Sequence, residues 1–174
     1  MGKQIGNLSF LTYLDIRNNS FTGIISDEIG NLRRLRRVRM SYNQLSGEIP
    51  LSFGLLTNLE ILDIQYNHLT GAIPWSIFNI SSLQAIAFTG NQLSRTLPND
   101  MCYQLSKLEG LYLSYNQLSG DIPTSLSACS QLIKLSLSYN NFTGAIPMHM
   151  GNLSQLQLLY LGSNKITGKS LDII

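Results

Sequence analysis

Few side chains in this sequence are of the types that act as general bases, nucleophiles or metal ligands. The two histidines, His68 and His149, stand far apart, and the two cysteines, Cys102 and Cys129, lie 27 positions apart. A zinc site needs more ligands at closer spacing, so we expect both histidines to be exposed in turns. We interpret Cys129 as a small buried apolar residue. A disulfide bond between the two cysteines is the less favoured alternative.

One further motif, Gly168-Lys169-Ser170, is similar to the end of a phosphate-binding loop. That loop requires a glycine five residues before Gly168, and Ser163 occupies the position. The sequence also lacks metalloprotease, nucleophile-elbow and kinase signatures. We therefore predict that the chain is not an enzyme and that it holds no cofactor or metal ion.

The spacing of one asparagine shows that the chain is built from an internal repeat. Leucine-like residues keep a constant phase around this asparagine, and a Gly-x-Ile-Pro segment follows it in four copies, for example at Gly47–Pro50. Such self-similarity is typical of solenoids, in which each copy buries its apolar side chains against its neighbours. The asparagine recurs at steps of 24 residues, once 25, as Asn19, Asn43, Asn67, Asn91, Asn116, Asn140 and Asn164.

The pattern within each copy predicts the local structure. The segment Leu-x-Leu-x-x-Asn indicates a short strand whose two leucines point inward while the intervening residues face solvent. The asparagine amide can satisfy backbone groups in the turn that follows, and stacked asparagines would form a hydrogen-bonded ladder. We therefore expect an α/β-type solenoid of about seven 24-residue repeats, with a parallel concave β-sheet and residues 1–174 forming one domain. The single inserted residue falls in 99–104, on the outer face.

The residue types within each repeat resemble those of a known family. Residues 56–74 read LTNLEILDIQYNHLTGAIP, which resembles the plant-specific leucine-rich repeat of receptor-like kinase ectodomains, receptor-like proteins and polygalacturonase inhibitors. Residues 77–83 (IFNISSL) and 129–132 (CSQL) resemble the immune-receptor kinases that sense bacterial elongation factor or flagellin. Two departures stand out: Ser26 replaces proline in the first copy, and Arg95 replaces glycine in the fourth.

The resemblance implies several further properties. The leucine-rich repeat superhelix should carry short second strands after the concave sheet and an outer face of 3-10 turns and loops. Its function should be recognition of a peptide or protein ligand, in defence or developmental signalling, with a co-receptor kinase as a possible second partner. The serine/threonine kinase domain of such a receptor is absent from this sequence.

The side chains that the repeat leaves on the concave sheet are the candidate ligand-binding residues. Tyrosine and arginine are favoured at binding hot spots because each combines a large contact area with a polar group. Tyrosines at repeat spacing can instead stack on one another and stiffen the sheet. The candidates form a charged patch over the first three repeats (Tyr13, Asp15, Arg17, Arg37, Arg39 and Asp63) and a tyrosine patch over the last three (Tyr112, Tyr115, Tyr139 and Tyr160).

Glycosylation motifs of the form Asn-x-Ser/Thr favour an extracellular origin. Three of them occupy one repeat position on the outer face, where a glycan would leave the sheet open, whereas Asn18 lies beside the concave strand. The candidate acceptors are Asn7, Asn18, Asn79, Asn141 and Asn152.

Charge and hydropathy exclude other classes of function. Twelve basic and ten acidic residues give a net charge of +2, too small to predict nucleic-acid binding. The sequence contains neither an apolar run of membrane-spanning length nor a signal peptide. We expect a piece of a longer receptor on the extracellular side of the plasma membrane. The alternatives are a soluble protein like the polygalacturonase inhibitors and a non-functional truncated receptor fragment.

Overall fold

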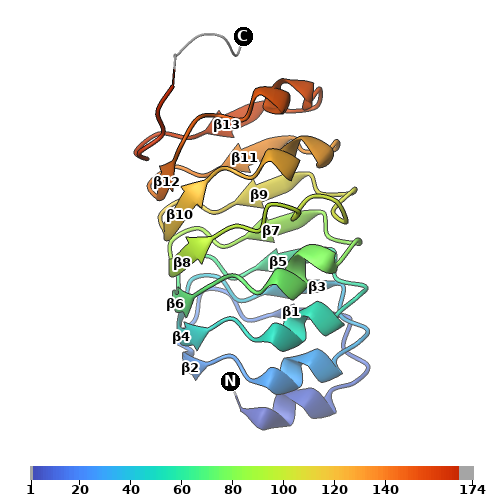
Figure 1. The fold of residues 1–174 in the computed structure, drawn as a ribbon. Coiled ribbons are helices and arrows are strands. Elements are labelled where there is room, and N and C mark those ends of the chain that lie inside the picture. The colour runs from blue at the N-terminus through green and yellow to red at the C-terminus, as the bar shows by residue number, and fades with distance from the viewer. Residues whose placement is uncertain (1, 169–174) are drawn as a thin grey trace.

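The polypeptide forms a curved coil in which successive turns stack on one another (Figure 1). The computed structural model describes residues 2–168. Within this range the first strand of each turn joins a seven-stranded parallel sheet whose strands follow one another in chain order. This sheet contains β1 (Tyr13–Asp15), β3 (Arg37–Arg39), β5 (Ile61–Asp63), β7 (Ala85–Ala87), β9 (Gly110–Tyr112), β11 (Lys134–Ser136) and β13 (Leu158–Tyr160).

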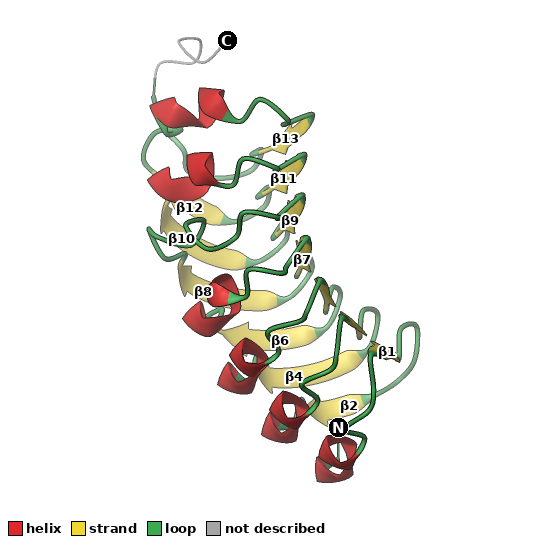
Figure 2. Cartoon of the chain, turned by 90° about the vertical axis from the view of Figure 1, so that its right-hand side faces the viewer, coloured by secondary structure: helices red, strands yellow, loops and turns green. Residues whose placement is uncertain are grey.

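A second parallel sheet of six strands runs beside the first in the described part of the chain. Figure 2 shows the odd-numbered strands along the inner, concave side of the bend and the helices along the outer side. The expected parallel concave sheet and second strands are therefore both present. The second sheet contains β2 (Thr22–Ile24), β4 (Gln44–Glu48), β6 (His68–Gly71), β8 (Gln92–Thr96), β10 (Gln117–Asp121) and β12 (Asn141–Thr143).

Short 3-10 helices form the outer face, and proline sets where most of them begin. Pro50, Pro74, Pro123 and Pro147 stand at helix N-caps with φ between −57° and −60°, the value that the proline ring imposes. Ser26 takes this place before η2 with φ −73°, so the departure from proline leaves the helix intact. The helices are η1 (Lys3–Asn7), η2 (Asp27–Asn31), η3 (Leu51–Leu55), η4 (Trp75–Asn79), η5 (Thr124–Ala128) and η6 (Met148–Asn152).

The second departure, Arg95, stands at a backbone position that favours glycine. The corresponding glycines, such as Gly71 and Gly120, have φ of 76° and 78°, and Arg95 has φ 74°. A side chain in this left-handed region is strained by crowding of its Cβ. The turn is therefore imposed on Arg95 by the neighbouring repeats rather than by its own preference.

The core is a stack of aliphatic side chains lying between the two sheets and the helices. Leucines at one repeat position are completely buried from the second repeat to the sixth: Leu35, Leu59, Leu83, Leu108 and Leu132. Because each leucine contacts its equivalents in the adjoining turns, every turn depends on its neighbours for burial.

The asparagine ladder expected from the sequence is also present. The amide of Asn67 donates to the carbonyl oxygens of Ile64 and Gln65 in its own turn, both at 3.1 Å, and to that of Met40 in the preceding repeat at 3.1 Å. Its Oδ1 accepts the Leu45 backbone N–H at 3.0 Å. Inter-repeat bonds of this kind recur at Asn43, Asn91, Asn116, Asn140 and Asn164.

The interpretation of Cys129 as an unbonded apolar residue is wrong, because a disulfide bond joins it to Cys102. Residues 98–106 contain the insertion and form turns where other repeats carry a 3-10 helix. These turns bring Cys102 to a Cα–Cα distance of 5.2 Å from Cys129, which directly follows η5. Both cysteines are buried. The bond therefore fastens an irregular outer segment to the next repeat.

Candidate functional site

The concave sheet brings the charged patch together across three strands. In register, Asp15 of β1 lies beside Arg39 of β3, which lies beside Asp63 of β5. Tyr13 and Arg37 are likewise paired across β1 and β3. Their side chains share the solvent face because they alternate with buried residues such as Leu14 and Val38 along each strand.

Most charges of this patch are already engaged within the protein. The Arg17 guanidinium donates to both Asp15 oxygens, with the closest approach 2.8 Å. Hydrogen bonds from the Arg17 side chain and backbone hold the pKa of Asp15 well below its usual range. The Tyr13 hydroxyl donates to Asp15 at 3.0 Å, and Asp63 accepts the Ser41 hydroxyl at 3.0 Å. Asp15 and Asp63 are therefore held in fixed orientations.

Arg39 stands apart from these engaged groups. Arg36 binds Glu60 at 2.6 Å, and Arg37 approaches the same carboxylate at 3.9 Å. Over residues 2–168, neither Arg39 nor Lys134 is within ion-pair distance of a carboxylate. Arg39 is half-buried on the sheet, so it presents a positive charge that no neighbouring carboxylate binds directly.

The tyrosine patch is divided between two structural positions. Tyr112 and Tyr160 belong to strands β9 and β13, whereas Tyr115 and Tyr139 lie in the turn after the strand with φ of 56° and 55°. The Tyr115 and Tyr139 rings stack with centroids 4.2 Å apart. A hydrogen bond with Tyr139 raises the pKa of Tyr115. Stacking supports the alternative in which these tyrosines stiffen the repeat array, although both rings remain about half exposed.

The same turn position holds a second tyrosine pair that the candidate list omitted. Tyr42 and Tyr66 stack with centroids 4.7 Å apart. Gly90 interrupts the column between the two pairs, and the Tyr66 ring covers it, because a Cβ on Gly90 would lie 2.6 Å from Tyr66 Cδ1. The column therefore consists of two separate stacks with one empty position.

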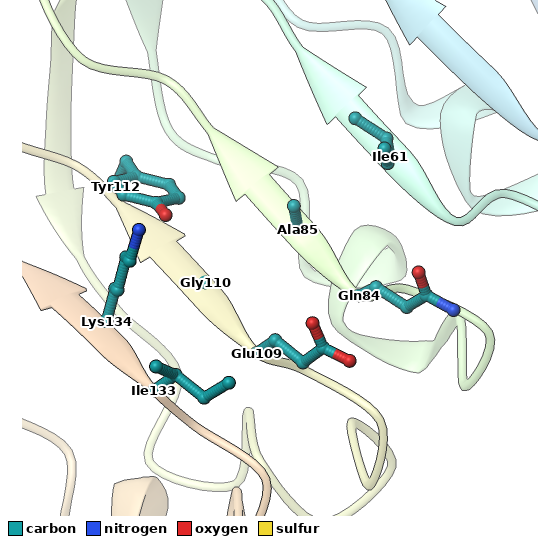
Figure 3. A pocket seen from close by; sticks show the side chains of 8 residues that line it. All are labelled: Ile61, Gln84, Ala85, Glu109, Gly110, Tyr112, Ile133 and Lys134. Atoms are coloured by element: carbon teal, nitrogen blue, oxygen red, sulfur yellow. The ribbon is translucent and has the colours of Figure 1, made fainter. Parts of the chain in front are cut away.

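A hollow that the sequence did not predict lies in the middle of the concave sheet. It has a volume of about 280 Å³ and is lined by residues of β5, β7, β9 and β11 and of the segments preceding them (Figure 3). Its lining is mixed: Ile61, Ala85, Gly110 and Ile133 are apolar, whereas Gln84, Glu109 and Lys134 are polar or charged. Burial raises the pKa of the Tyr112 phenol, which also lines the hollow. The available signal was the run of small residues at concave positions where other repeats carry charged or aromatic side chains.

Residues that could act in catalysis are dispersed. His68 is exposed at the start of β6 rather than in a turn, and His149 is exposed in η6. In the part of the chain that the structure describes, histidines, cysteines and carboxylates do not gather in a group capable of holding a metal ion. Lys169 and Ser170 of the phosphate-loop-like motif lie outside the described residues. Among residues 2–168, every helix is too short to cross a membrane.

The glycosylation candidates differ in accessibility. Asn7, Asn79 and Asn152 are the last residues of η1, η4 and η6, and all three side chains are exposed on the outer face. Asn18 is exposed but occupies the left-handed turn beside the concave sheet, with φ 54°. Asn141 is half-buried in β12.

The repeated strands, the asparagine ladder and the open concave face define a leucine-rich repeat protein, and the comparisons with known proteins agree. Two models, both described as leucine-rich repeat, match residues 57–118 and residues 10–32, 34–56 and 131–153. Together these matches cover most of the chain, which therefore belongs to the leucine-rich repeat family. No curated protein sequence gives a significant match.

Solved structures identify the plant receptor-kinase type of repeat. The ectodomain of the Arabidopsis thaliana membrane receptor kinase GASSHO1/SCHENGEN3, in complex with CASPARIAN STRIP INTEGRITY FACTOR 2, is 38% identical with a TM-score of 0.94. The match covers 98% of this chain and 20% of that one. The Arabidopsis receptor kinase HAESA, in complex with the peptide hormone IDA and the co-receptor SERK1, is 33% identical with a TM-score of 0.92. That match covers 95% of this chain and 28% of HAESA.

A relative of a different function shares the fold. A plant ice-binding protein is 31% identical with a TM-score of 0.86, over 95% of this chain and 53% of that one. The fold alone therefore does not determine the ligand. The chain also spans only about a quarter of each receptor, so the activities of the whole receptors do not transfer directly.

Proposed function

We propose that this chain is a ligand-recognising segment of the extracellular part of a plant receptor-like kinase and that it binds a peptide or protein on its concave face. Support comes from the similar receptor ectodomains, which were solved with peptide hormones or a named protein factor. The observation that carries the proposal is the concave sheet, which carries both Arg39, a half-buried cation without an ion pair among the described residues, and a separate hollow with apolar and polar lining residues. Such a combination favours recognition of a ligand with both polar and apolar groups.

The remainder of the receptor would supply what this chain does not contain. Signalling would follow when the bound ligand recruits a co-receptor kinase, and the serine/threonine kinase domain would belong to the parent protein. The role of such a receptor would be in defence or developmental signalling. The inhibitor-like and truncated-fragment alternatives have no observation in their favour.

Charge reversal at Arg39 tests the proposed binding face. A random dodecapeptide library displayed on phage should yield peptides that bind the parent chain. Arg39→Glu should weaken their binding at least about tenfold, since truncating one member of a hydrogen-bonded charge pair typically costs at least that much. Titration calorimetry measures the affinities, and circular dichroism melting shows whether the variant, which places a glutamate between Asp15 and Asp63 on the sheet, is still folded at the temperature of the binding measurement.

Arg95→Glu is the matched control, because it makes the same charge change on the second sheet at an exposed position of β8. The peptides selected on the parent chain should bind Arg95→Glu with the same affinity as they bind the parent. Failure to enrich any binding peptide, or equal affinity in the parent and Arg39→Glu, would remove the concave charged patch from the proposed function.

Glycosylation provides a separate test of the proposed acceptor sites on the outer face. When the chain is expressed behind a secretion signal in plant cells, Asn7, Asn79 and Asn152 should carry glycans because they project from the outer face. Release by peptide N-glycosidase converts each occupied asparagine to aspartate, which peptide mass spectrometry detects. Asn79→Gln should remove one glycan. Unmodified asparagine at all three positions in the secreted protein would count against the proposed outer-face sites.

A further inference from the structure

Two phenol side chains are held face to face at the surface, in adjoining turns of the solenoid. Tyr115 lies in the turn after β9, and Tyr139 lies at the equivalent place after β11. The Tyr115 backbone N–H donates to the Ser138 carbonyl at 3.0 Å, and the Asn116 N–H donates to the Tyr139 carbonyl at 3.1 Å. These bonds between turns fix the backbone positions from which both rings project.

The geometry of the rings brings the reactive positions of the two phenols together. The ring centroids are 4.2 Å apart, the ring planes are inclined by only 11°, and a hydrogen bond joins the Tyr115 and Tyr139 side chains. In a phenoxyl radical the unpaired electron is shared among the oxygen, Cγ and the two Cε carbons beside the oxygen. Because the hydroxyl groups meet and the rings are nearly parallel, the Cε atoms of one ring lie next to those of the other.

Both rings are also open to an oxidant in solution. Tyr115 is 52% exposed and Tyr139 is 49% exposed, so either phenol can be oxidised without opening the fold. Holding two reactants side by side makes their combination an event within one molecule, which is much faster than an encounter between separate molecules. Radicals formed at this pair should therefore combine with each other.

The other exposed tyrosines are less favourably placed. Tyr103 is 68% exposed, but among residues 2–168 it stacks on no other tyrosine. Tyr42 and Tyr66 stack with their centroids 4.7 Å apart and their planes inclined by 20°. Tyr115 and Tyr139 are therefore the closest and most nearly parallel tyrosine pair in the described part of the chain.

We propose that Tyr115 and Tyr139 form an oxidative cross-linking site, at which hydrogen peroxide and a haem peroxidase join the two rings as dityrosine. The oxidant removes one electron and the hydroxyl proton from each phenol, and the two radicals combine in a new Cε–Cε bond. The hydrogen on each bonded Cε then moves to the phenol oxygen and restores the aromatic ring. The pair loses two hydrogen atoms in all, and hydrogen peroxide accepts them to become two molecules of water.

The cross-link would fasten the fifth repeat to the sixth at the edge of the concave sheet. The two tyrosines are 24 positions apart, so the bond closes a loop of one whole turn and restricts the unfolded chain. The disulfide between Cys102 and Cys129 instead joins neighbouring turns on the outer face. This modification does not depend on the proposed ligand recognition, and either proposal can fail without the other.

Peptide mapping of the oxidised full chain tests the site. The chain is treated with hydrogen peroxide and a haem peroxidase, and the monomer is isolated and reduced. Trypsin cuts after Lys107, Lys134 and Lys165, so the two tyrosines fall on different peptides. Mass spectrometry should find these peptides joined, with a mass lower than their sum by two hydrogen atoms. The oxidised monomer should also show dityrosine fluorescence and a higher midpoint of urea denaturation than the untreated chain.

Tyr115→Phe keeps the stacked ring but removes one phenol, so it should fold as the parent does. It should lose the joined peptides, most of the fluorescence and the rise in the denaturation midpoint. Tyr103→Phe is the matched control, because it removes a more exposed phenol that has no stacked partner, and it should behave as the parent. Circular dichroism melting checks the fold of each variant.

Three results would overturn the proposal. The first is an oxidised monomer without the peptide pair that contains Tyr115 and Tyr139. The second is equal dityrosine fluorescence in the parent and in folded Tyr115→Phe. The third is coupling found only between separate molecules, which would show that the stacked arrangement does not direct the reaction.

Discussion

Asn67→Ala is expected to lower the free energy of unfolding by about 3 kcal/mol, because it removes a buried amide that links two repeats. The side chain forms four hydrogen bonds, including those with the Met40 carbonyl and the Leu45 N–H of the preceding repeat. Alanine would leave these buried backbone groups without partners, and each such group costs about 1–3 kcal/mol. Urea titration followed by circular dichroism measures the change.

Hydrogen exchange locates the effect within the repeat array. The Leu45 amide should exchange faster in Asn67→Ala, since its acceptor is lost, whereas the Leu69 amide keeps Asn91 as its acceptor at 3.1 Å. Asn19→Ala is the matched control at the first repeat. The Asn19 side chain is exposed and donates to the Ile16 and Arg17 carbonyls of its own turn, so its loss should cost about 1 kcal/mol or less. Equal losses at Asn19 and Asn67 would refute the role assigned to the inter-repeat bonds.

Cys102→Ala is expected to destabilise the protein by about 3–4 kcal/mol, the chain-entropy value for a cross-link that closes a loop of this length. The cysteines are 27 residues apart. The bond lies in the repeat whose outer segment, residues 98–106, forms turns instead of a 3-10 helix. An irregular segment therefore separates η4 from η5. Without the disulfide, residues 98–106 would be held to the next repeat mainly by apolar packing. Guanidinium denaturation of the oxidised parent and the variant measures the difference.

Reduction gives an independent control for this second prediction. Dithiothreitol should lower the denaturation midpoint of the parent but leave that of Cys102→Ala,Cys129→Ala unchanged. Thiol titration of the unfolded, unreduced parent should detect no reactive cysteine. Two titratable thiols, together with a midpoint insensitive to reductant, would show that the bond does not form in solution.

The periodic pattern of the sequence was sufficient to predict the solenoid. Asparagine and leucine at constant spacing determine which residues turn the chain and which face inward, and residues one repeat apart become neighbours in adjacent turns. This is why the strands at Arg37–Arg39 and Ile61–Asp63, and the inter-repeat bonds of Asn67, followed from spacing alone. The same logic placed Asp15, Arg39 and Asp63 in one row of the sheet, which their register confirms.

Features that depend on side-chain direction or on an irregular loop required the tertiary structure. Spacing does not reveal that Arg17 turns back to bind Asp15, that the Tyr112 ring leans over Gly110, or that Tyr115 and Tyr139 stack. These arrangements arise from rotamers chosen among several neighbours. As a result, Arg17 and Arg39 were predicted as equivalent members of one charged patch. Only the structure shows that Arg17 pairs with Asp15, whereas Arg39 forms no ion pair in residues 2–168.

The disulfide shows most clearly where prediction from the repeat pattern ends. The 27-residue separation of Cys102 and Cys129 is close to one repeat, which was a signal that the two side chains lie in adjoining turns. The insertion interrupts the period at that point, so the repeat pattern no longer specifies where the loop backbone goes. The sequence by itself determined the regular frame and the outward-facing columns. The disulfide bond depends on how residues 98–106 pack against the next turn, and the hollow depends on how individual side chains pack. Both are matters of local geometry, which the spacing of the repeat does not determine.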